Sequence, residues 1–530
     1  MMKIDENYNS FLKKRIVILS LLSIGIAGFF IRLYFEPQVP LTGDASNYFV
    51  YAADTALKGR VTEIYFLANS GWSLILSGLF SIIGLDDPIS LMQSQRLLSI
   101  VISVVTIIPL YFLCRRFFNN YYSIIGVSLF IFEPHVVVNS TLGITEPIFL
   151  FFGITTITLF LSKNKINTYI SFVVLGLFSI IRYEGLILFV TLTILYFIKF
   201  RHNRKNLLGY PLILIMFLLT ILPVAYVNFE MHERDGFLSE FLDTGGYSYN
   251  VFVEGEIDEG DPIYGEKNNS NVQTFLSTGI KNTIWMFGLL LFPMLFIFTI
   301  IGTIFIIKEK KFFNIDFNRL TIILVSISML IPVLYAYGRG LEDPRFLFMI
   351  LPLVILISVY GISKWRIRKK NILMIAVIGV FFLVSFTYLD FKKIDYDHEN
   401  ELFQITKFVN ERTNIINDDS VDFKYRTASG IIVDWPELPQ AVGESHLDRK
   451  LDLLSTKGYN TLDEFIESSK SKNLEYIAVD GRINQPKFLH DVFYYDEKYT
   501  YLNKIFDSMD EEMNYHVKIF KIDFEVKNGK

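Results

Sequence analysis

The side chains of this sequence that could do chemistry are acids and arginines at the ends of long apolar runs. Asp44 follows the first such run, in "GDASNYFVYAADTALKG", and Tyr48 comes about one helical turn later. Glu146 begins another run, in "STLGITEPIFLFF". A carboxylate can remove a proton from a hydroxyl group, and at the edge of a bilayer it is costly unless water or a partner solvates it. These acids therefore indicate a polar site at the membrane surface.

Two further stretches combine arginine with acids in the same setting. "IRYEGL" places Arg182 and Glu184 between two apolar runs. "YGRGLEDPRFLF" places four charged residues just before another run: Arg339, Glu342, Asp343 and Arg345. Charged groups at the ends of a bilayer are costly unless they are solvated or paired. We therefore expect these residues to form one water-filled polar site with the two acids, provided that they lie on the same side of the membrane.

Each of these residues also has a purely structural interpretation. Asp44 could cap the helix that follows it, and Glu146 could be favoured by the positive end of a helix dipole. Arg182 and Glu184 could form an interfacial ion pair, and Arg345 could extend to lipid headgroups. Four such coincidences on one face are less probable than any one of them, which favours a functional site.

The positions of these residues depend on the transmembrane helices around them. Apolar residues make up 52% of the 530 residues, and the formal net charge of −4 gives no indication of a nucleic-acid partner. An apolar run of about 20 residues crosses a bilayer. The sequence predicts about eleven spans, at residues 16–35, 91–113, 121–138, 144–161, 166–182, 184–199, 209–228, 282–307, 319–337, 345–362 and 371–389. The shorter run 72–84 predicts an interfacial or re-entrant helix.

The basic residues predict the orientation, because Lys and Arg collect in cytoplasmic loops. With the N-terminus in the cytoplasm, every inner segment is basic and the outer loops are poor in Lys and Arg; the inner segments are 1–15, 114–120, 162–167, 199–206, 308–319 and 363–370. The longest outer loop, 229–280, is rich in acids. This topology places all the candidate site residues on the outer face of a multi-pass protein of the cell membrane.

Beyond residue 389 the sequence takes on the pattern of a soluble domain. A helix is predicted at 401–411, strands at "GIIVDW", "LEYIAVDG" and "YHVKIFKIDFEV", and a capping box of Thr461 and Glu464 before "TLDEFIESSK". We therefore expect two domains: a transmembrane domain over residues 1–389 and a small α/β domain over residues 390–530, outside the cytoplasm.

Other motifs point to no further site. His135 follows Glu133 closely, but no second His or Cys stands at ligand spacing, so a core or interfacial histidine is favoured over a metal ligand. Asn139 and Asn268 stand in N-x-S/T patterns on the outer side, which would permit N-glycosylation in a host that has the machinery.

Together these stretches resemble the GT-C superfamily of membrane glycosyltransferases, most closely the protein O-mannosyltransferases and aminoarabinose transferases (glycosyltransferase family 39-like). The resemblance lies in "GDASNYFVYAADTALKG", "QSQRLLSIVISVVTIIPLYFLCRRFF", "FEPHVVVNSTLGITEPIFLFFGITTITLF", "GLFSIIRYEGLILF" and "DPRFLFMILPLVIL". It covers most of residues 1–389 and implies a mainly helical GT-C-like domain. The appended outer α/β domain is also similar to what related prokaryotic enzymes carry.

The resemblance implies roles for individual residues. Asp44 matches the catalytic acid of the first outer loop, Glu146 matches a second acid, and Arg345 and Arg182 match residues that bind the lipid phosphate. The other polar residues of the outer site are expected to help bind substrate: Tyr48, Glu184, Arg339 and Glu342. The family has an acidic pair in the first loop where this sequence has one acid, with Glu63 farther along. Because of this departure the sequence does not establish metal use: a divalent cation is a candidate cofactor, and its ligands are unknown.

The resemblance implies a glycosyltransferase that moves a sugar, such as mannose, from a polyprenyl-phosphate (dolichyl-phosphate-like) donor in the membrane lipid. The acceptor is a protein, lipid or glycan on the outer face, and we expect inversion at the anomeric carbon. An oligosaccharyltransferase is an alternative, although the WWDYG signature of that branch is reduced here to "VDWPE". A secondary transporter is a further alternative; it would need ionisable residues in mid-span, whereas the acids here lie at span ends. A sensor is another; it would need a cytoplasmic output domain, whereas the predicted inner segments are short.

Overall fold

The computed structural model describes most of the chain, as two compact units. One unit comprises Met1–Glu36, Val61–Ile75 and Gln95–Lys393, and the other Pro37–Arg60, Leu76–Ser94 and Ile394–Lys530. The described residues are 2–62, 66–85, 87–249, 272–309, 316–364, 370–393, 396–397, 400–401, 403–405, 442–444, 451–453, 459–470, 474–480 and 486–527. Glu63, Asn268, the stretches "GIIVDW" and "VDWPE", and most of the predicted helix 401–411 lie outside them.

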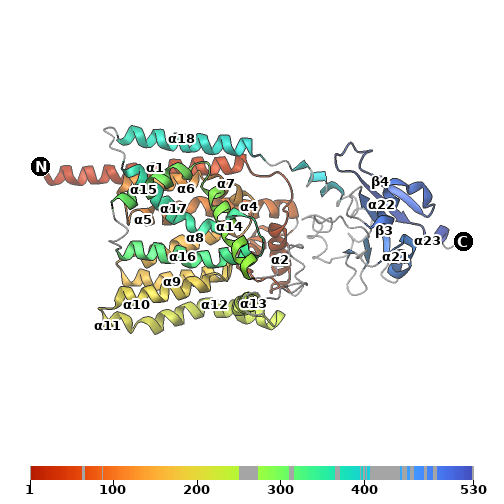
Figure 1. The fold of residues 1–530 in the computed structure, drawn as a ribbon, viewed down its shortest axis with the longest axis horizontal. Helices are drawn as coiled ribbons and strands as arrows, with labels where there is room; N and C mark the ends of the chain where they lie inside the picture. The colour runs from red at the N-terminus through yellow and green to blue at the C-terminus, as the bar shows by residue number, and fades with distance from the viewer. Residues whose placement is uncertain are drawn as a thin grey trace. The chain divides into compact units, whose positions relative to one another are not determined.

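The first unit is a bundle in which the longer helices, such as α12, α16 and α18, run alongside one another (Figure 1). Its elements are α1 (Met2–Tyr34), α4 (Pro88–Val105, which begins in the other unit), α5 (Ile107–Cys114), α6 (Asn120–Ile131), α7 (Pro134–Thr141), α8 (Glu146–Phe160), α9 (Lys165–Ile181), α10 (Gly185–Phe200), α11 (Arg204–Leu207), α12 (Tyr210–His232), α13 (Leu238–Tyr249), α14 (Val272–Leu291), α15 (Leu295–Lys308), α16 (Phe317–Gly338), η3 (Pro344–Ile350), α17 (Leu351–Ser363) and α18 (Lys370–Phe391).

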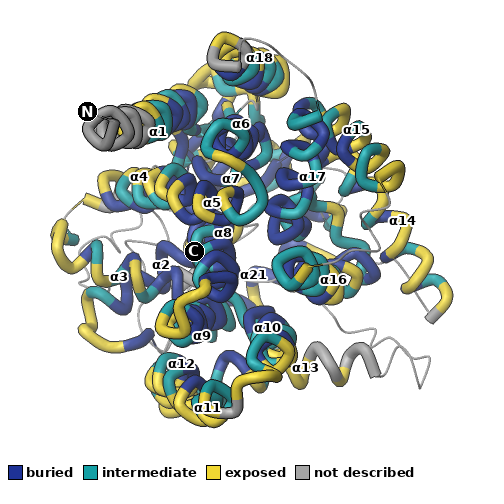
Figure 2. Tube along the Cα trace, turned by 90° about the vertical axis from the view of Figure 1, so that its left-hand side faces the viewer, coloured by how far each residue is buried: buried dark blue, intermediate teal, exposed yellow. Residues whose placement is uncertain are grey.

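The bundle confirms a multi-pass membrane protein. Among the described residues, six helices are long and apolar enough to span a bilayer, or up to eight if each of two bent pairs counts as one span. Figure 2 shows buried positions facing the inside of the bundle and exposed ones on its periphery, as on α12. The exposed side chains there are apolar, such as Leu219 and Leu222, which suits contact with lipid. The predicted count of eleven stays a prediction, because α8, α9 and α10 are shorter apolar helices.

Two predicted spans are not straight. The span predicted at 282–307 is wrong as a single helix, because α14 and α15 meet at 108°. Pro293 lies at this break, where its ring and missing N–H prevent a helix from continuing. The span predicted at 121–138 bends by 52° between α6 and α7.

The bend between α6 and α7 is held by buried polar side chains. Arg32 of α1 is fully buried, and its Nη1 donates to the carbonyl oxygen of Ile131 at 3.0 Å. Its Nε and Nη2 donate to Ser140 Oγ at 2.9 Å and Ser103 Oγ at 3.1 Å. Glu133 caps α7 by accepting from Val136 N at 2.8 Å. The backbone groups that the bend frees are thus satisfied inside the bundle, as the bilayer requires.

The second unit contains α2 (Asp44–Lys58), part of α3 (Gly71–Ile83) and a C-terminal α/β region. α3 confirms the short helix predicted at 72–84. The sheet has the order β2-β1-β3-β5-β4 with antiparallel pairs. Its elements are β1 (Val442–Glu444), β2 (Leu451–Leu453), α21 (Leu462–Ser469), β3 (Leu474–Asp480), α22 (Lys487–Tyr494), η7 (Asp496–Lys498), β4 (Leu502–Asp507), β5 (Val517–Ile522) and α23 (Phe524–Lys527).

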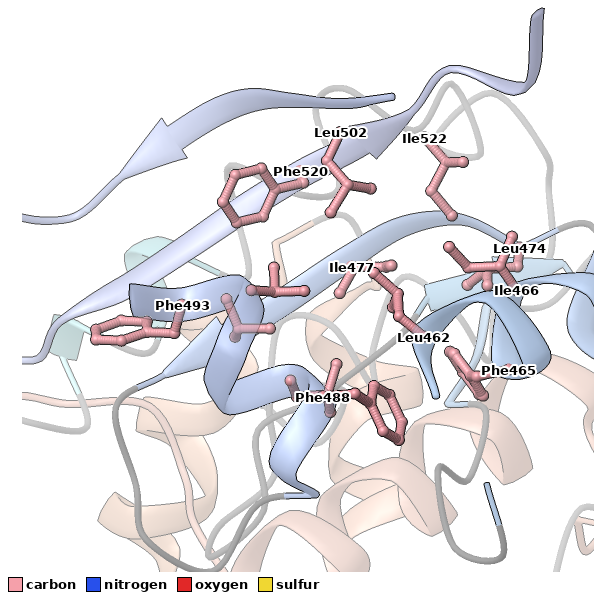
Figure 3. Close-up of a cluster of buried hydrophobic side chains, with 13 residues drawn as sticks. Leu462, Phe465, Ile466, Leu474, Ile477, Phe488, Phe493, Leu502, Phe520 and Ile522 are labelled. Atoms are coloured by element: carbon pink, nitrogen blue, oxygen red, sulfur yellow. The ribbon is translucent and has the colours of Figure 1, made fainter. Parts of the chain in front are cut away.

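The sequence pattern explains this sheet and its helices. The strands predicted at "LEYIAVDG" and "YHVKIFKIDFEV" are β3 and β5. Thr461 caps α21 by accepting from Glu464 N at 3.2 Å, as predicted. Apolar side chains of α21 and α22 pack on Ile477 of β3 and Phe520 of β5 (Figure 3). The predicted fold class, mainly helical with a small C-terminal α/β region, is confirmed.

Candidate active site

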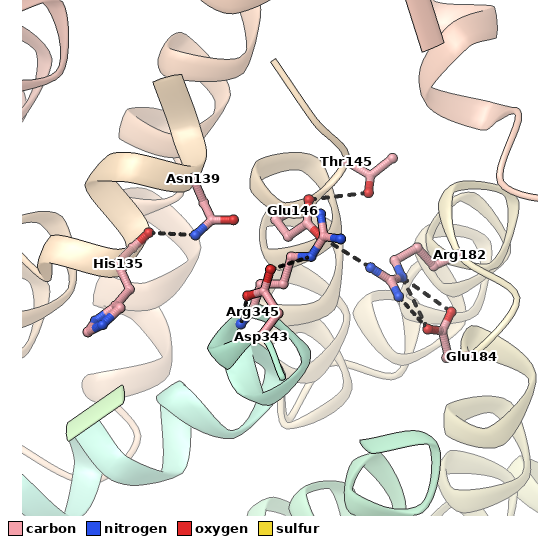
Figure 4. Close-up of polar contacts among 8 residues, drawn as sticks. All are labelled: His135, Asn139, Thr145, Glu146, Arg182, Glu184, Asp343 and Arg345. Atoms are coloured by element: carbon pink, nitrogen blue, oxygen red, sulfur yellow. Dashed lines mark hydrogen bonds and ion pairs between the residues drawn. The ribbon is translucent and has the colours of Figure 1, made fainter. Parts of the chain in front are cut away.

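The centre of the candidate site is the carboxylate of Glu146, which two arginines from distant parts of the chain share. Arg182 Nη1 lies 3.3 Å from Glu146 Oε1, and Arg345 Nη1 lies 3.7 Å from the same oxygen. The side chain of Glu146 is only 3% exposed. Figure 4 shows the carboxylate between the two guanidinium groups. The structure thus brings together three of the predicted site residues.

The local structure of α8 explains the position of Glu146. Glu146 is the first residue of this helix and Pro147 the second, a position where proline is favoured because its missing N–H costs no hydrogen bond. Thr145 Oγ1 donates to Glu146 Oε2 at 3.4 Å. The predicted preference of an acid for a helix N-terminus is therefore met, and the same carboxylate also binds the arginines.

Arg182 and Glu184 lie in the tight turn between α9 and α10. Arg182 Nη2 and Nε donate to Glu184 Oε1 at 2.7 and 3.1 Å, so the predicted ion pair is present. The guanidinium carbon lies 5.2 Å from the ring centroid of Phe149, which fixes the plane of the group. Gly185 allows the turn, since an added Cβ would lie 2.7 Å from the Cα of Ser179. Arg182 is therefore held on three sides.

Arg345 stands at the start of η3 and is held more loosely. Its Nε lies 3.1 Å from Asp343 Oδ2, and its backbone N donates to Asp343 Oδ1 at 2.9 Å. The Tyr337 hydroxyl donates to the carbonyl oxygen of Asp343 at 2.9 Å, which ties this loop to α16. The side chains of Arg345 and Asp343 are 24% and 44% exposed. Arg345 is thus the arginine on the solvent side of the cluster.

Asp343 is an acid to which the sequence analysis assigns no role in binding or catalysis, and the structure places it beside Arg345. The signal was available, because Asp before Pro at the start of a helix is a typical N-cap. The cluster of Glu146, Arg182, Glu184, Arg345 and Asp343 holds three carboxylates against two guanidinium groups. An anionic ligand that binds Arg345 must therefore compete with the Asp343 carboxylate.

Asp44 belongs to the second unit, at the first position of α2. The structural alternative in which Asp44 caps the helix is wrong: the N-cap is Gly43, with φ of 54°, a conformation that favours glycine. Asp44 is exposed, whereas Tyr48, predicted to bind substrate, is buried. The catalytic role of Asp44 stays a prediction.

Arg339 and Glu342 have different surroundings. The guanidinium carbon of Arg339 lies 5.6 Å from the ring centroid of Tyr335, and Glu342 is exposed in the loop that follows α16. Their predicted part in substrate binding stays a prediction.

The described residues offer no clear set of metal ligands. Nowhere in this part of the chain do three or more His, Cys, Asp or Glu side chains gather closely enough to hold a metal ion. His135 Nδ1 lies 2.9 Å from Glu133 Oε1, and Asn139 Nδ2 donates to the His135 carbonyl oxygen at 3.0 Å. These contacts orient His135, and the mechanism proposed below uses no metal.

Comparisons with known proteins find a family model for one part of the chain and solved structures for most of it. A family model for dolichyl-phosphate-mannose-protein mannosyltransferase matches residues 74–227, a range that contains Glu146, Arg182 and Glu184. No curated protein sequence matches the chain.

Solved structures of two kinds resemble the whole chain. The apo oligosaccharyltransferase of Archaeoglobus fulgidus has a TM-score of 0.59 at 12% identity, over 93% of this chain and 73% of that one. The same organism's AglB with an inhibitory peptide and a dolichol-phosphate has a TM-score of 0.56 at 12% identity, over the same shares. Apo ArnT from Cupriavidus metallidurans has a TM-score of 0.55 at 8% identity, over 95% of this chain and 97% of that one. The predicted resemblance to GT-C glycosyltransferases is confirmed, and the chain has their fold.

Proposed function

We propose that this protein is a membrane glycosyltransferase that moves a sugar from a polyprenyl-phosphate donor to an acceptor hydroxyl group on the extracytoplasmic face. The observation that carries the proposal is the buried carboxylate of Glu146 with two arginines around it, at the end of a helical bundle with the GT-C fold. A donor of this kind keeps its tail in lipid and its phosphate at the interface, so a cation at a helix end is suited to bind it.

Arg345 is the proposed phosphate ligand. Its 3.1 Å contact with Asp343 is the most solvent-exposed ion pair of the cluster, and exposed pairs contribute little stability. A phosphate oxygen can therefore replace the Asp343 carboxylate at modest cost. Glu146 keeps the guanidinium group of Arg345 in place during this exchange, because its carboxylate also contacts Arg345.

The proposed reaction is a single displacement at the anomeric carbon. Asp44 accepts the proton of the acceptor hydroxyl as this oxygen attacks, and the bond from the sugar to the phosphate oxygen breaks with inversion. The electron pair leaves with the phosphate, whose charge Arg345 stabilises. Glu146 acts by positioning the arginines.

The sidedness of the site follows from the distribution of charge. The basic loop pattern favours a cytoplasmic N-terminus, with a transmembrane domain over residues 1–389 and an extracytoplasmic domain over residues 390–530. Glu146, Arg182 and Arg345 then face the compartment in which the acceptor is found.

An oligosaccharyltransferase is the second candidate. Two observations favour it: the higher TM-score to the Archaeoglobus fulgidus enzyme, and the dolichol-phosphate and peptide that AglB binds. The chain spans 97% of ArnT but 73% of the archaeal enzyme, which favours the first candidate. A protein acceptor suits both candidates.

The test is transfer of radiolabelled mannose from a synthetic polyprenyl-phosphate donor by the purified full-length protein. We expect Asp44→Asn to reduce the rate at least about a hundredfold, the low end of general-base loss. The matched control is Asp390→Asn, which removes an exposed acid at the end of α18 and should leave the rate unchanged. Near wild-type activity in Asp44→Asn would falsify the role of Asp44. Transfer only from an oligosaccharide diphosphate donor to an asparagine peptide would instead establish the second candidate.

A further inference from the structure

A cavity lies within the first unit, at the ends of α5, α8 and α9. Its volume is about 390 Å³, and its lining residues are Phe112, Arg115, Arg116, Thr158, Leu159 and Asn167. This volume falls within the range of about 300–1,000 Å³ that is typical of small-molecule sites. The cavity is separate from the Glu146 cluster, because α8 begins at Glu146 and reaches Thr158 about 18 Å farther along its axis.

The charge of this cavity is entirely positive. Arg115 and Arg116 line it, no acid among the described residues does, and Lys199 is an electrostatic neighbour of Arg116. Among the residues that the structure describes, neither arginine forms an ion pair with a carboxylate. Arg115 Nη1 donates to the carbonyl oxygen of Phe118 at 2.5 Å, and a guanidinium group has five N–H donors in all. Like charges gathered in this way repel one another, and a bound anion relieves the repulsion.

The cavity also adjoins an apolar surface of the bundle. Ile108 and Phe112 of α5 are 52% and 55% exposed and lie one helical turn apart. Arg115 and Arg116 follow one turn later on the same side of the helix, just past the end of the candidate span Ile89–Cys114. An apolar stripe thus leads along the membrane-facing helix into a pair of cations.

From these observations we propose that the cavity binds the phosphate headgroup of an anionic phospholipid. The headgroup phosphate lies against Arg115 and Arg116, with Asn167 beside it, and an acyl chain follows Phe112 and Ile108. A phospholipid is favoured over a free phosphate because the apolar stripe suits an acyl chain and offers nothing to a soluble anion. This site is independent of the proposed transfer reaction.

The test compares two lipids with identical acyl chains, phosphatidylglycerol and phosphatidylcholine, on the full-length protein in neutral detergent. Native mass spectrometry counts bound lipid, and thermal unfolding measures stabilisation over a titration. We expect the wild-type protein to prefer phosphatidylglycerol. Arg115→Gln/Arg116→Gln should weaken its apparent affinity at least about fivefold and abolish the preference.

The matched control is Lys205→Gln/Lys308→Gln, which removes two exposed cations outside the cavity and should keep the preference. Arg116→Lys keeps the charge and should bind nearly as well, which guards against a double variant that fails to fold. A preference that persists in Arg115→Gln/Arg116→Gln overturns the proposal. Equal stabilisation by inorganic phosphate also overturns it, because the ligand is then a soluble anion. Neither readout depends on sugar transfer.

Discussion

The arginines near the two ends of α8 have different surroundings. At the N-terminal end, Arg182 and Arg345 contact three carboxylates. At the C-terminal end, Arg115 and Arg116 line a cavity that has no acid among the described residues. A paired arginine is oriented but must exchange a partner to bind an anion, whereas an arginine without a carboxylate partner can bind one directly. The first arrangement suits selective catalysis and the second suits retention of a lipid.

The largest expected effect is on the carboxylate that joins the two arginines. Glu146→Ala leaves Arg182 and Arg345 without their shared acid in a largely buried site, which should cost about 3 kcal/mol of unfolding free energy. Chemical unfolding in detergent measures this. Glu146→Gln keeps the shape of the side chain and should lose transfer activity as well. If Glu146→Ala had the same unfolding free energy as the wild type, Glu146 would not hold the two arginines as proposed.

The next effect concerns the exchange of ligands at Arg345. Arg345→Gln removes a charged hydrogen-bond donor to phosphate and should raise the KM for the lipid donor about tenfold. Asp343→Asn should lower that KM, because it removes the competing charge while asparagine still caps η3. Steady-state kinetics over a titration of the lipid donor measure the KM of each variant. A raised KM in Asp343→Asn would count against the exchange.

The smallest effect is expected for an ion pair at the other end of the bundle. Glu309 binds Lys364 and Tyr360, and both charged side chains are partly exposed, so Glu309→Gln should cost less than about 1 kcal/mol. The hydrogen bond from Lys364 to Glu309 raises the pKa of Lys364 above its ordinary 10.5. The contribution of this ion pair to the free energy of unfolding is therefore present at neutral pH and is lost as the pH rises above 10.5 through the raised pKa of Lys364. Chemical unfolding of the wild-type protein and Glu309→Gln at pH 8 and pH 11 should show that their difference in unfolding free energy is smaller at pH 11.

Much of the fold could be predicted from local patterns. The apolar runs predicted most of the helices, the alternating stretches predicted β3 and β5, and Thr461 predicted the start of α21. Each of these signals lies within a few turns or a single strand. The straight span at 282–307 was a wrong prediction, although Pro293 marks the break between α14 and α15, because hydropathy alone does not show the direction of the chain after a proline.

By itself the sequence determined which residues stand at membrane boundaries, because the bilayer imposes the length of each span and acids and arginines are costly inside it. Only the tertiary structure decided that Glu146, Arg182 and Arg345 share one carboxylate, that Asp343 completes the cluster, and that Arg115 and Arg116 line a cavity. The reason is physical: these contacts join helices far apart in the chain, and which faces meet depends on the packing of the whole bundle.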